Sequence, residues 1–504
     1  MSWGSFELLI GVCLLLLAIY HYYVANYNFW SSQKVPGPKP LPFFGNVKDV
    51  ILGKMSLGDY LTKIYNDYVD EPIIGIYDRR KPICVVKDPE LIKDVLIKDF
   101  AAFADRGLSR NYKVEPLLKT LFFLEPNGWR PLRSNLSPTF TSGKLKDMFY
   151  LLIECADHLE QYLAKCVERD PVIECCELTA KFTTDVIGSC AFGLKMNALT
   201  EEESQFRAIG RKVFRTNGMK FVKSRIKEYL PFMLNWFPAF FYDHEVNDFF
   251  INTMRQTMEY RKKNKVRRAD FVDLLMELRE NPQKVGDIEL DDVLITSQAF
   301  LFFVAGFETS SSTISNALYE LAQHQPIQDK LRREIHEELK RCDGQIKYDS
   351  IKNMSYMDKV FNETLRKYPP LTSLMRRSTK PYTFYGTKVT LPAHTRLLIP
   401  VFAIHRDPQI YPEPEIFDPE RFSKENKNTR HSSHYLPFGD GPRNCIAMRF
   451  AIIQSKVGLV KILNNYRVEV CDKTLIPYRK NPRAFLLAPL GGIHLKFTRI
   501  ESDS

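Results

Sequence analysis

The 504-residue sequence predicts a mainly helical protein of the α+β class, with small β-sheets at its periphery. Three observations lead to this prediction. The longest internal apolar segment, from about residue 288 to 324 with Asp287 as its N-cap, has the all-round hydrophobicity of a buried central helix. Segments typical of strands are short and clustered, at 72–77, 83–86 and 385–401. The composition, with 44% hydrophobic and 26% charged residues, excludes disordered and fibrous classes.

The N-terminal segment is expected to attach the chain to a membrane. Residues 6–24 are apolar except for Glu7 and His21, and no Lys or Arg precedes them. A cleaved signal peptide normally has basic residues before its apolar core, so an uncleaved anchor is favoured. Lys34 and Lys39 follow, and the positive-inside rule then places the rest of the chain in the cytosol. Because the stretch is short for a bilayer and contains Glu7, a tilted or interfacial helix is an alternative.

The chain is expected to have three parts: an anchor over residues 1–28, a proline-rich connector over 29–43 and one large domain over 44–504. The prolines between residues 36 and 42 predict a stiff, non-helical connector, because proline fixes φ and removes an amide donor. Beyond the connector, the sequence contains no second linker, low-complexity segment or repeat.

Charge and cysteine usage narrow the classes further. The net charge of +11 is spread along the chain without a dense basic block, so no nucleic-acid partner is expected. A basic surface also suits an acidic partner protein or an anionic membrane face. The ten cysteines are scattered, with neither a CxxC pair nor regular spacing, which argues against a disulfide scaffold or a zinc site. Most are expected to be buried thiols in a reducing compartment.

One cysteine, Cys445, is distinguished by its surroundings, the segment LPFGDGPRNCIAMRF. The prolines and glycines before it predict an irregular loop, and the residues after it predict a helix. The N-terminus of a helix favours a thiolate, because the helix dipole and unpaired N–H groups stabilise negative sulfur. A cysteine in this position is still more often an ordinary buried thiol. The deciding feature is that Phe438, Gly441, Arg443 and Cys445 form the pattern F-x-x-G-x-R-x-C.

This pattern resembles the haem-binding signature of the cytochrome P450 family. The resemblance implies that Cys445 is the axial thiolate ligand of a haem b iron, that Phe438 packs beside the sulfur, and that Arg443 pairs with a haem propionate. The sequence departs from the signature at Ala447, where the family usually has glycine. The added methyl group is expected to change the haem packing locally.

Further family motifs precede the cysteine in the expected order. Glu363 and Arg366 resemble the ExxR motif, whose spacing puts both charges on one helical face. Arg421, in the segment DPERF, resembles the third member of the family's buried Glu-Arg-Arg network, whose implied role is structural. Glu338 and Arg341 have the same spacing and are expected to form a solvated surface pair.

The segment Ala305-Gly306-Phe307-Glu308-Thr309 of the long helix looks like the family's oxygen-binding segment. A threonine beside an acid suits proton relay, because the hydroxyl can hold a water or dioxygen while the carboxylate passes protons from solvent. Glu308 and Thr309 are therefore the expected catalytic residues, with Ala305 beside the cofactor. The glycine is expected to let a ligand lie against the helix. In isolation, the same residues would indicate a threonine bonded to its own helix and an exposed glutamate.

Arginines for the haem propionates are expected at several positions. Trp129 and Arg133 resemble the family's W-x-x-x-R motif, one helical turn apart. Arg376 and Arg106 match two further propionate-binding arginines, although Arg377 adjoins the former. Arginine suits this role because its planar fork forms paired, charge-assisted hydrogen bonds with carboxylates.

The resemblance also implies an activity, a microsomal monooxygenase that inserts one oxygen atom from O2 into a lipophilic substrate. The aromatic richness of the chain favours an apolar pocket, for foreign compounds such as insecticides and plant toxins or for steroids. The side chains expected to line it, each of which could equally be core, are Phe122, Phe123, Phe302, Leu371, Leu374 and Leu486.

The implied partners are a membrane flavoprotein reductase that uses NADPH, with cytochrome b5 as an optional second donor, and the endoplasmic reticulum membrane, with the catalytic domain on its cytosolic side. The reductase is expected on a basic face behind Cys445 that contains Arg130, Lys144, Lys146 and Arg449. Two other classes stay open: a haem-thiolate isomerase or dehydratase that needs no reductase, and a haem protein that senses gas or carries electrons. Glu308 and Thr309 argue against both.

Overall fold

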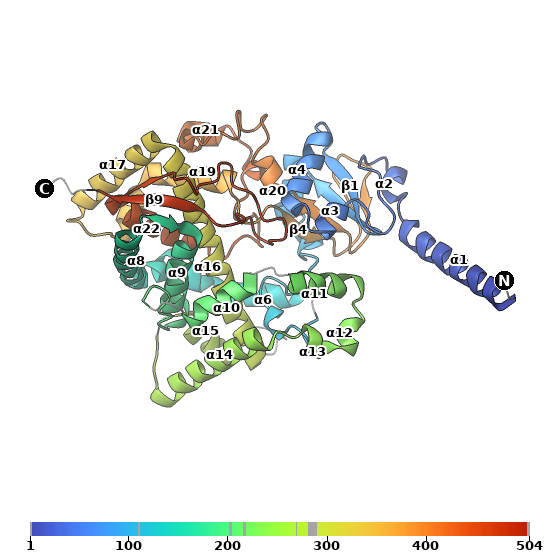
Figure 1. Ribbon diagram of the computed structural model, residues 1–504, viewed down its shortest axis with the longest axis horizontal. Coiled ribbons are helices and arrows are strands. Elements are labelled where there is room, and N and C mark those ends of the chain that lie inside the picture. The colour runs from blue at the N-terminus through green and yellow to red at the C-terminus, as the bar shows by residue number, and fades with distance from the viewer. Residues whose placement is uncertain are drawn as a thin grey trace. The chain divides into compact units, whose positions relative to one another are not determined.

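The computed structural model describes residues 3–108, 111–200, 204–214, 218–268, 270–280 and 290–500. Its described part is mainly helical with three small sheets, which confirms the expected fold class (Figure 1). The chain packs as two compact units, each assembled from segments that are far apart in the sequence. Unit 1 comprises Met1–Gly107, Leu371–Pro412 and His431–Asn444, and unit 2 comprises Leu108–Pro370, Glu413–Arg430 and Cys445–Ser504. No shift of composition marks these borders, so no local signal predicts them.

Unit 1 is organised by a four-stranded sheet in the order β1-β2-β7-β4. The strands β1 and β2 form an antiparallel hairpin, β7 runs parallel to β2, and β4 is antiparallel to β7. The hairpin lies where the two earlier strand patterns predict it, and β6 and β7 lie within the predicted segment 385–401. The strands of this sheet are β1 (Ile73–Asp78), β2 (Lys81–Val86), β4 (Leu374–Arg377) and β7 (Arg396–Ile399). A separate two-stranded sheet consists of β5 (Tyr382–Thr383) and β6 (Thr390–Leu391). The helices of unit 1 are α1 (Trp3–Val24), α2 (Phe29–Ser32), α3 (Lys48–Ile51), α4 (Leu57–Asp67), α5 (Pro89–Lys93), η1 (Asp94–Lys98), η2 (Phe100–Phe103), α20 (Val401–Ile404) and η8 (Ser432–His434).

Unit 2 is a helical body with one three-stranded sheet in the order β3-β9-β8. Its strands are β3 (Val172–Glu174), β8 (Tyr466–Glu469) and β9 (His494–Arg499). Its helices are η3 (Pro116–Leu118), α6 (Pro126–Leu136), η4 (Ser137–Phe140), α7 (Ser142–Asp147), α8 (Phe149–Arg169), α9 (Cys175–Ile187), η5 (Gly188–Phe192), α10 (Gln205–Phe214), α11 (Gly218–Tyr229), α12 (Met233–Trp236), α13 (Pro238–Phe241), α14 (His244–Asn264), α15 (Phe271–Glu280), α16 (Asp292–Gln323), α17 (Gln325–Arg341), α18 (Tyr348–Asn353), α19 (Ser355–Lys367), η7 (Pro419–Phe422), α21 (Lys424–Asn428) and α22 (Met448–Asn465).

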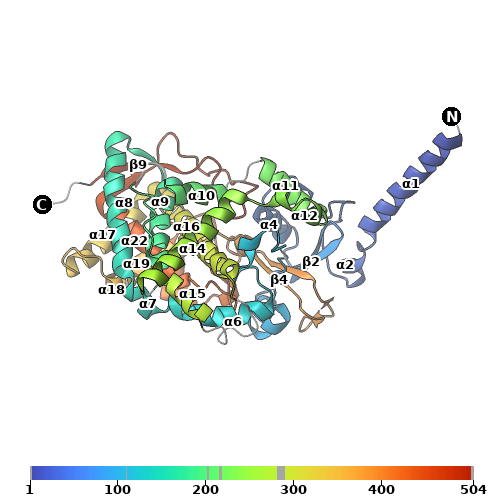
Figure 2. The same cartoon turned by 90° about the horizontal axis from the view of Figure 1, so that it is seen from below.

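The long helix α16 is the central helix that the sequence predicts. It begins at Asp292, where Asp291 caps it by accepting a hydrogen bond from the Leu294 N–H at 2.6 Å. The cap expected at Asp287 lies outside the described residues. With 32 residues the helix is about 48 Å long. It packs against α9, α14, α19 and α22, and Figures 1 and 2 both show helices of unit 2 along its sides. Its position in the core explains why apolar residues occur all round it.

The N-terminal helix α1 differs from α16 although both are long and apolar. The segment Phe6–Val24 has a mean hydropathy of 1.9 and is unburied, whereas α16 has a mean hydropathy of 1.4 and is largely buried. An apolar helix that is fully exposed in its own fold has the properties of a membrane anchor, and one that is covered by other helices has those of a core helix.

Candidate active site

The loop before Cys445 is held in an irregular conformation by glycine. Gly439 and Gly441 both have φ of +69°. At Gly441 the requirement is also steric, because a Cβ atom there would lie 1.9 Å from the backbone oxygen of Leu96. The loop closes on itself through a hydrogen bond from the Asn444 N–H to the Gly441 oxygen at 3.0 Å. The conformation therefore needs glycine at the fourth position of the F-x-x-G-x-R-x-C pattern.

Four arginines of unit 1 that the sequence singles out have different partners. Arg443 is buried, and its backbone oxygen accepts a hydrogen bond from Nη2 of the half-buried Arg106 at 3.0 Å. Arg377 is committed to Asp105, whose Oδ2 accepts from Arg377 Nε at 3.0 Å. Arg376, the neighbour of Arg377 on β4, has no such carboxylate partner among the described residues.

Arg376 is only 3% exposed, and no carboxylate pairs with it among the residues that the structure describes. Its Nη1 donates to the backbone oxygen of Met375 at 2.8 Å, while Nε is buried without an acceptor in the described part of the chain. Burial lowers the pKa of Arg376 to about 10, so the side chain is still a cation at neutral pH. A buried guanidinium with no counter-charge fits the carboxylate of a haem propionate.

In unit 2, Cys445 lies three residues before α22, whose N-cap is Ala447. Cys445 is exposed, so its sulfur is accessible to a cofactor. Arg133, on α6, is close enough to Cys445 to interact with its charge: burial lowers the pKa of Arg133, and the negative sulfur raises it. Trp129 is buried one turn earlier on the same helix. The cysteine and the W-x-x-x-R arginine, more than three hundred residues apart in the sequence, are therefore neighbours in unit 2.

On α16, the hydroxyl of Thr309 donates to the backbone oxygen of Ala305 at 2.7 Å. This is the hydrogen bond to its own helix that the threonine was expected to make in isolation. The contact uses the hydroxyl proton and leaves the oxygen lone pairs able to accept. Ala305 is exposed.

Glu308 is not the exposed glutamate of the alternative interpretation. Burial raises the pKa of its carboxyl, the positive charge of Arg207 lowers it, and the negative charge of Glu177 raises it. Arg207 lies on α10 and is buried, and Glu177 on α9 accepts from its Nε at 3.1 Å and its Nη2 at 2.7 Å. A carboxyl whose pKa is raised towards neutrality is suited to exchange protons at physiological pH.

The expectation for Gly306 is wrong. A Cβ atom at this position would lie 2.4 Å from Cδ1 of Ile187, at the end of α9. The glycine thus lets two helices approach each other, and it does not open space for a ligand. The sequence could not show this, because the contact joins residues more than a hundred positions apart.

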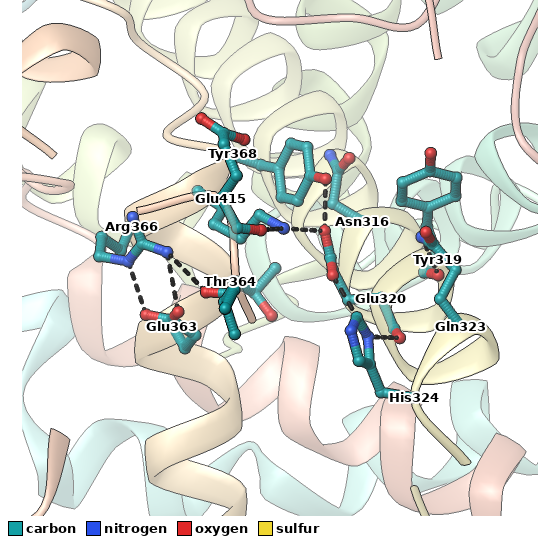
Figure 3. Close-up of polar contacts among 12 residues, drawn as sticks. Asn316, Tyr319, Glu320, Gln323, His324, Glu363, Thr364, Arg366, Tyr368 and Glu415 are labelled. Atoms are coloured by element: carbon teal, nitrogen blue, oxygen red, sulfur yellow. Dashed lines mark hydrogen bonds and ion pairs between the residues drawn. The ribbon is translucent and has the colours of Figure 1, made fainter. Parts of the chain in front are cut away.

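The Glu363–Arg366 pair forms a buried network as expected (Figure 3). Both side chains are fully buried on α19, and the guanidinium donates to the two carboxylate oxygens at 2.7 and 2.8 Å. Arg366 Nη2 also donates to the Pro414 oxygen at 2.7 Å, and Arg421 Nε lies 3.5 Å from Glu363 Oε1. Burial raises the pKa of Glu363, and Arg366 is the strongest opposing influence.

The second pair with this spacing, on α17, is only half solvated. Arg341 is exposed as expected, but Glu338 is buried, so the prediction of a fully solvated pair is wrong for the glutamate. The physical reason is that Glu338 faces the interior of unit 2 while the longer arginine side chain extends into solvent.

The six side chains expected in the substrate pocket are distributed over both units. In unit 2, Phe302 packs against Phe140 and Phe271, with ring centroids 5.1 and 4.2 Å apart, so it contributes to the core. Phe122 and Phe123 contact each other at 5.1 Å, and Leu486 is buried. Leu371 and Leu374 belong to unit 1 and are partly buried. The pocket role of all six stays a prediction.

Sequence reasoning missed Arg207 and Glu177 altogether. Neither belongs to a motif, and they lie on different helices, 30 positions apart. The one signal that could have pointed to such residues is the general rule that a nearby opposite charge stabilises a buried acid, and this rule does not say where in the sequence that charge lies.

Comparison with known proteins identifies the family. The family model described as cytochrome P450 matches residues 35–496. The chain is 40% identical to cytochrome P450 6a2 of Drosophila melanogaster, over 98% of this chain and 99% of that protein. It is also 40% identical to cytochrome P450 6A1 of Musca domestica, over 99% of each chain, and 38% identical to cytochrome P450 6j1 of Blattella germanica, over 96% of each chain.

A family model that covers nearly the whole chain agrees with what the residues themselves offer: a cysteine presented before a helix, an arginine beside its sulfur and a buried arginine without a counter-charge. Members of this family hold haem by a cysteine thiolate, act on lipophilic substrates and receive NADPH-derived electrons through a reductase. The chain therefore belongs to the cytochrome P450 family and is a haem-dependent monooxygenase.

Proposed function

We propose that this monooxygenase is a microsomal enzyme that oxidises lipophilic foreign compounds, with Cys445 as the axial ligand of its haem. The observation that carries the assignment of Cys445 is its exposure. Among the ten cysteines only Cys13 and Cys445 are exposed, and Cys13 lies within the anchor helix. A sulfur that is to bind iron must be presented to the cofactor, and the other cysteines do not present theirs to the same degree.

The haem would be held by residues with distinct tasks. Cys445 would bind the iron, with Phe438 beside the sulfur. Arg376 and Arg443, which are both buried, would pair with propionates, as would Arg133 and Arg106. Trp129 and Ala305 would contact the cofactor. When bound, the haem supplies dioxygen activation, which no protein side chain can perform.

Protons would reach the reaction through Glu308 and Thr309. Burial raises the pKa of Glu308, which favours the protonated form of the carboxyl and suits it to donate a proton and recover it from solvent. Thr309 would accept a hydrogen bond through its free lone pairs and orient the group that receives the proton. Thr309→Ala is expected to keep the haem but to increase the share of NADPH that ends as hydrogen peroxide. Unchanged coupling would remove Thr309 from the pathway.

Three further assignments complete the proposal. The chain is divided into an anchor over residues 1–28, a connector over 29–43 and a haem-binding catalytic domain over 44–504. The enzyme resides in the endoplasmic reticulum membrane with the catalytic domain in the cytosol, and cytochrome b5 is an optional second electron donor.

The reductase docks on a surface of exposed basic residues, Arg130, Lys144, Lys146 and Arg449. Reversal of these charges is expected to weaken reductase binding and its dependence on salt.

The substrate class follows from the pocket residues that the sequence favours: Phe122, Phe123, Phe302, Leu371, Leu374 and Leu486. All six are apolar and offer no side-chain partner for the hydroxyl or ketone of a steroid. A pocket of this kind would bind through apolar contact and select for lipophilicity more than for a particular polar group. We therefore favour foreign compounds such as insecticides and plant toxins over steroids.

The decisive experiment is the difference spectrum of the reduced, carbon monoxide-bound protein. Thiolate ligation shifts the Soret band to the red relative to imidazole ligation. The wild-type protein is expected to show the thiolate band and Cys445→Ser to lose it, whereas Cys471→Ser, at a cysteine outside the proposed site, is expected to keep it. A thiolate band that survives Cys445→Ser would overturn the assignment. NADPH-dependent oxidation of a panel of insecticides and steroids then tests the substrate class.

A further inference from the structure

The segment that follows the anchor helix is fixed to the sheet of unit 1. Trp30 is 3% exposed, and its Nε1 donates to the backbone oxygen of Ile76 on β1 at 3.0 Å. The Trp30 N–H donates to the hydroxyl of Tyr77, which in turn donates to the backbone oxygen of Tyr27 at 3.0 Å. A Cβ atom at Gly75 would lie 2.3 Å from the Trp30 ring, so this glycine makes room for the indole.

The proline-rich stretch continues the same attachment. The Gly75 N–H donates to the Pro36 oxygen at 2.8 Å, and Leu41 pairs with Gly45, which itself pairs with Asp78 at the end of β1. The stretch therefore lies along β1 as an added layer. Because it is bonded along its length, the foot of α1 and the β1–β2 turn keep a fixed relation to each other.

The foot of α1 contacts the β1–β2 turn directly. The guanidinium of Arg80, in the turn, lies 3.9 Å from the ring centroid of Tyr22, which belongs to the last turn of α1. The Asn26 side chain donates to the Arg80 oxygen at 3.4 Å. On the neighbouring side, the rings of Tyr23 and Phe43 are 5.0 Å apart.

Three basic side chains near the β1–β2 turn form no ion pair with a described acidic residue. Among the described residues, no carboxylate pairs with Arg80, Lys81 or the exposed Lys34. The adjacent Asp78 is already engaged, at 3.3 Å by Arg79 and at 3.2 Å by Arg396. The turn therefore presents positive charge that no carboxylate of the described residues neutralises.

Exposed apolar side chains accompany these cations. Tyr22 is 59% exposed, and Leu41 and Phe43 are also exposed although both are large and hydrophobic. From the anchor towards the sheet, the order is thus an apolar helix, then aromatic residues, then basic residues. This is the order in which side chains meet the hydrocarbon, the interface and the headgroups of a membrane.

We propose that Tyr22, Leu41, Phe43, Arg80 and Lys81, here named the collar, form a docking surface for the anionic phospholipid headgroups of the bilayer into which α1 inserts. The proposal rests on the membrane attachment of α1. A lipid surface is favoured over an acidic protein because the collar is continuous with the anchor, so any other partner would have to share its place with the headgroups. Lipid phosphates would meet Arg80 and Lys81, and the aromatic rings would lie at the level of the headgroups.

The test uses the full-length holoprotein in nanodiscs of phosphatidylcholine alone and of phosphatidylcholine with phosphatidylserine. Hydrogen–deuterium exchange is followed in peptides from α1, from the stretch 39–45 and from the turn 78–82. Phosphatidylserine is expected to slow exchange in the stretch and the turn by about 10-fold, since each of two cations contributes a few-fold in binding. High salt is expected to remove most of this gain.

The double variant Arg80→Gln/Lys81→Gln is expected to lose the phosphatidylserine effect while α1 stays protected. A matched control, Lys424→Gln/Lys427→Gln on α21, removes the same charge outside the collar and is expected to keep the effect. Equal exchange in both nanodiscs, or an effect that survives in the Arg80/Lys81 variant, would overturn the collar. Failure of the underlying membrane attachment would look different, because the α1 peptide itself would then exchange freely.

Discussion

Two buried arginines, one in each unit, show how differently the same side chain is used. Arg366 is fully enclosed and bound by both carboxylate oxygens of Glu363 and by the Pro414 oxygen. Arg376 is enclosed almost as completely, but its guanidinium donates to a backbone oxygen, that of Met375, and no carboxylate pairs with it in the described part of the chain.

The partners of each arginine indicate its role, which is structural for Arg366 and ligand binding for Arg376. A buried cation is expensive unless an anion accompanies it, so a paired arginine is complete within the protein. A buried arginine without an anion stores an unfavourable charge until a ligand supplies the missing partner. Arg366 therefore belongs to the structure of the apoprotein, and we infer that Arg376 is completed by a haem propionate.

The largest expected effect is at the paired arginine. Glu363→Ala leaves the Arg366 guanidinium buried without its carboxylate, which should cost about 3–5 kcal/mol of the free energy of unfolding. The yield of folded protein and the urea midpoint measure this loss. The double variant Glu363→Ala/Arg366→Met removes both charges and should recover part of it. A single variant with the wild-type midpoint would erase the distinction between the two arginines.

The next largest effect is expected at Arg376, where substitution should weaken haem retention and leave the stability of the apoprotein intact. Arg376→Gln should leave the apoprotein at least as stable as the wild type, because it removes an uncompensated buried charge. It should weaken haem retention by about 1.5–3 kcal/mol, the contribution of a hydrogen bond to a charged group. Transfer of haem to an acceptor protein measures the retention. Arg377→Gln is the matched control, since it breaks the contact with Asp105 and should leave haem transfer nearly unchanged.

Arg207 is intermediate between Arg366, which pairs with a carboxylate, and Arg376, which pairs with none in the described part of the chain. Glu177 binds two of its nitrogens, while Nη1 is buried without an acceptor among the described residues. Its charge lowers the pKa of Glu308, which burial raises. Because the folded-state pKa of Glu308 lies above its unfolded value, the stability that its protonation contributes is full at low pH. This contribution is lost as the pH rises through the folded-state pKa.

Arg207→Gln should raise the pKa of Glu308 further and so move this loss of stability to higher pH. The pH profile of product formed per NADPH should move in the same direction. Thermal midpoints across pH and the coupling profile measure the two shifts. Arg207→Lys retains the charge and should move both less. If both profiles coincide with those of the wild type, Arg207 does not act on the carboxyl.

The smallest effect is expected at the exposed arginine of the second pair. The Arg341 side chain is 69% exposed, so solvent screens this pair more than the Glu363–Arg366 pair, and Arg341→Ala should lower the free energy of unfolding by clearly less than Glu363→Ala. The urea midpoint provides the measurement. A loss comparable to that of Glu363→Ala would mean that burial is not what separates pairs of identical spacing.

The sequence predicts those features that depend on local order along the chain. The β1–β2 hairpin, the long apolar helix and the Glu363–Arg366 pair all follow from periodicity or from fixed spacing within one element. The glycine-dependent loop before Cys445 also follows, because glycine and proline act on the backbone where they stand.

Features that depend on contacts between distant elements could not be predicted in this way. Gly306 was expected to face a ligand but faces Ile187, because helical periodicity does not reveal which neighbour covers which side. The choice between Arg376 and Arg377 needed Asp105, far away in the sequence. Glu177 and Arg207 reach Glu308 only through the packing of three helices.

Gly306 is also a position at which the spacing between α16 and α9 could be changed by substitution. The spacing between α16 and α9 is set at this point by a single missing carbon atom opposite Ile187. Gly306→Ala alone would force the helices apart, whereas Gly306→Ala combined with Ile187→Ala would exchange bulk across the contact. Such paired exchanges would change the position of α16, which carries Glu308 and Thr309, through the side of the helix that contacts α9. Reactivity could thereby be tuned without altering any group that meets the substrate.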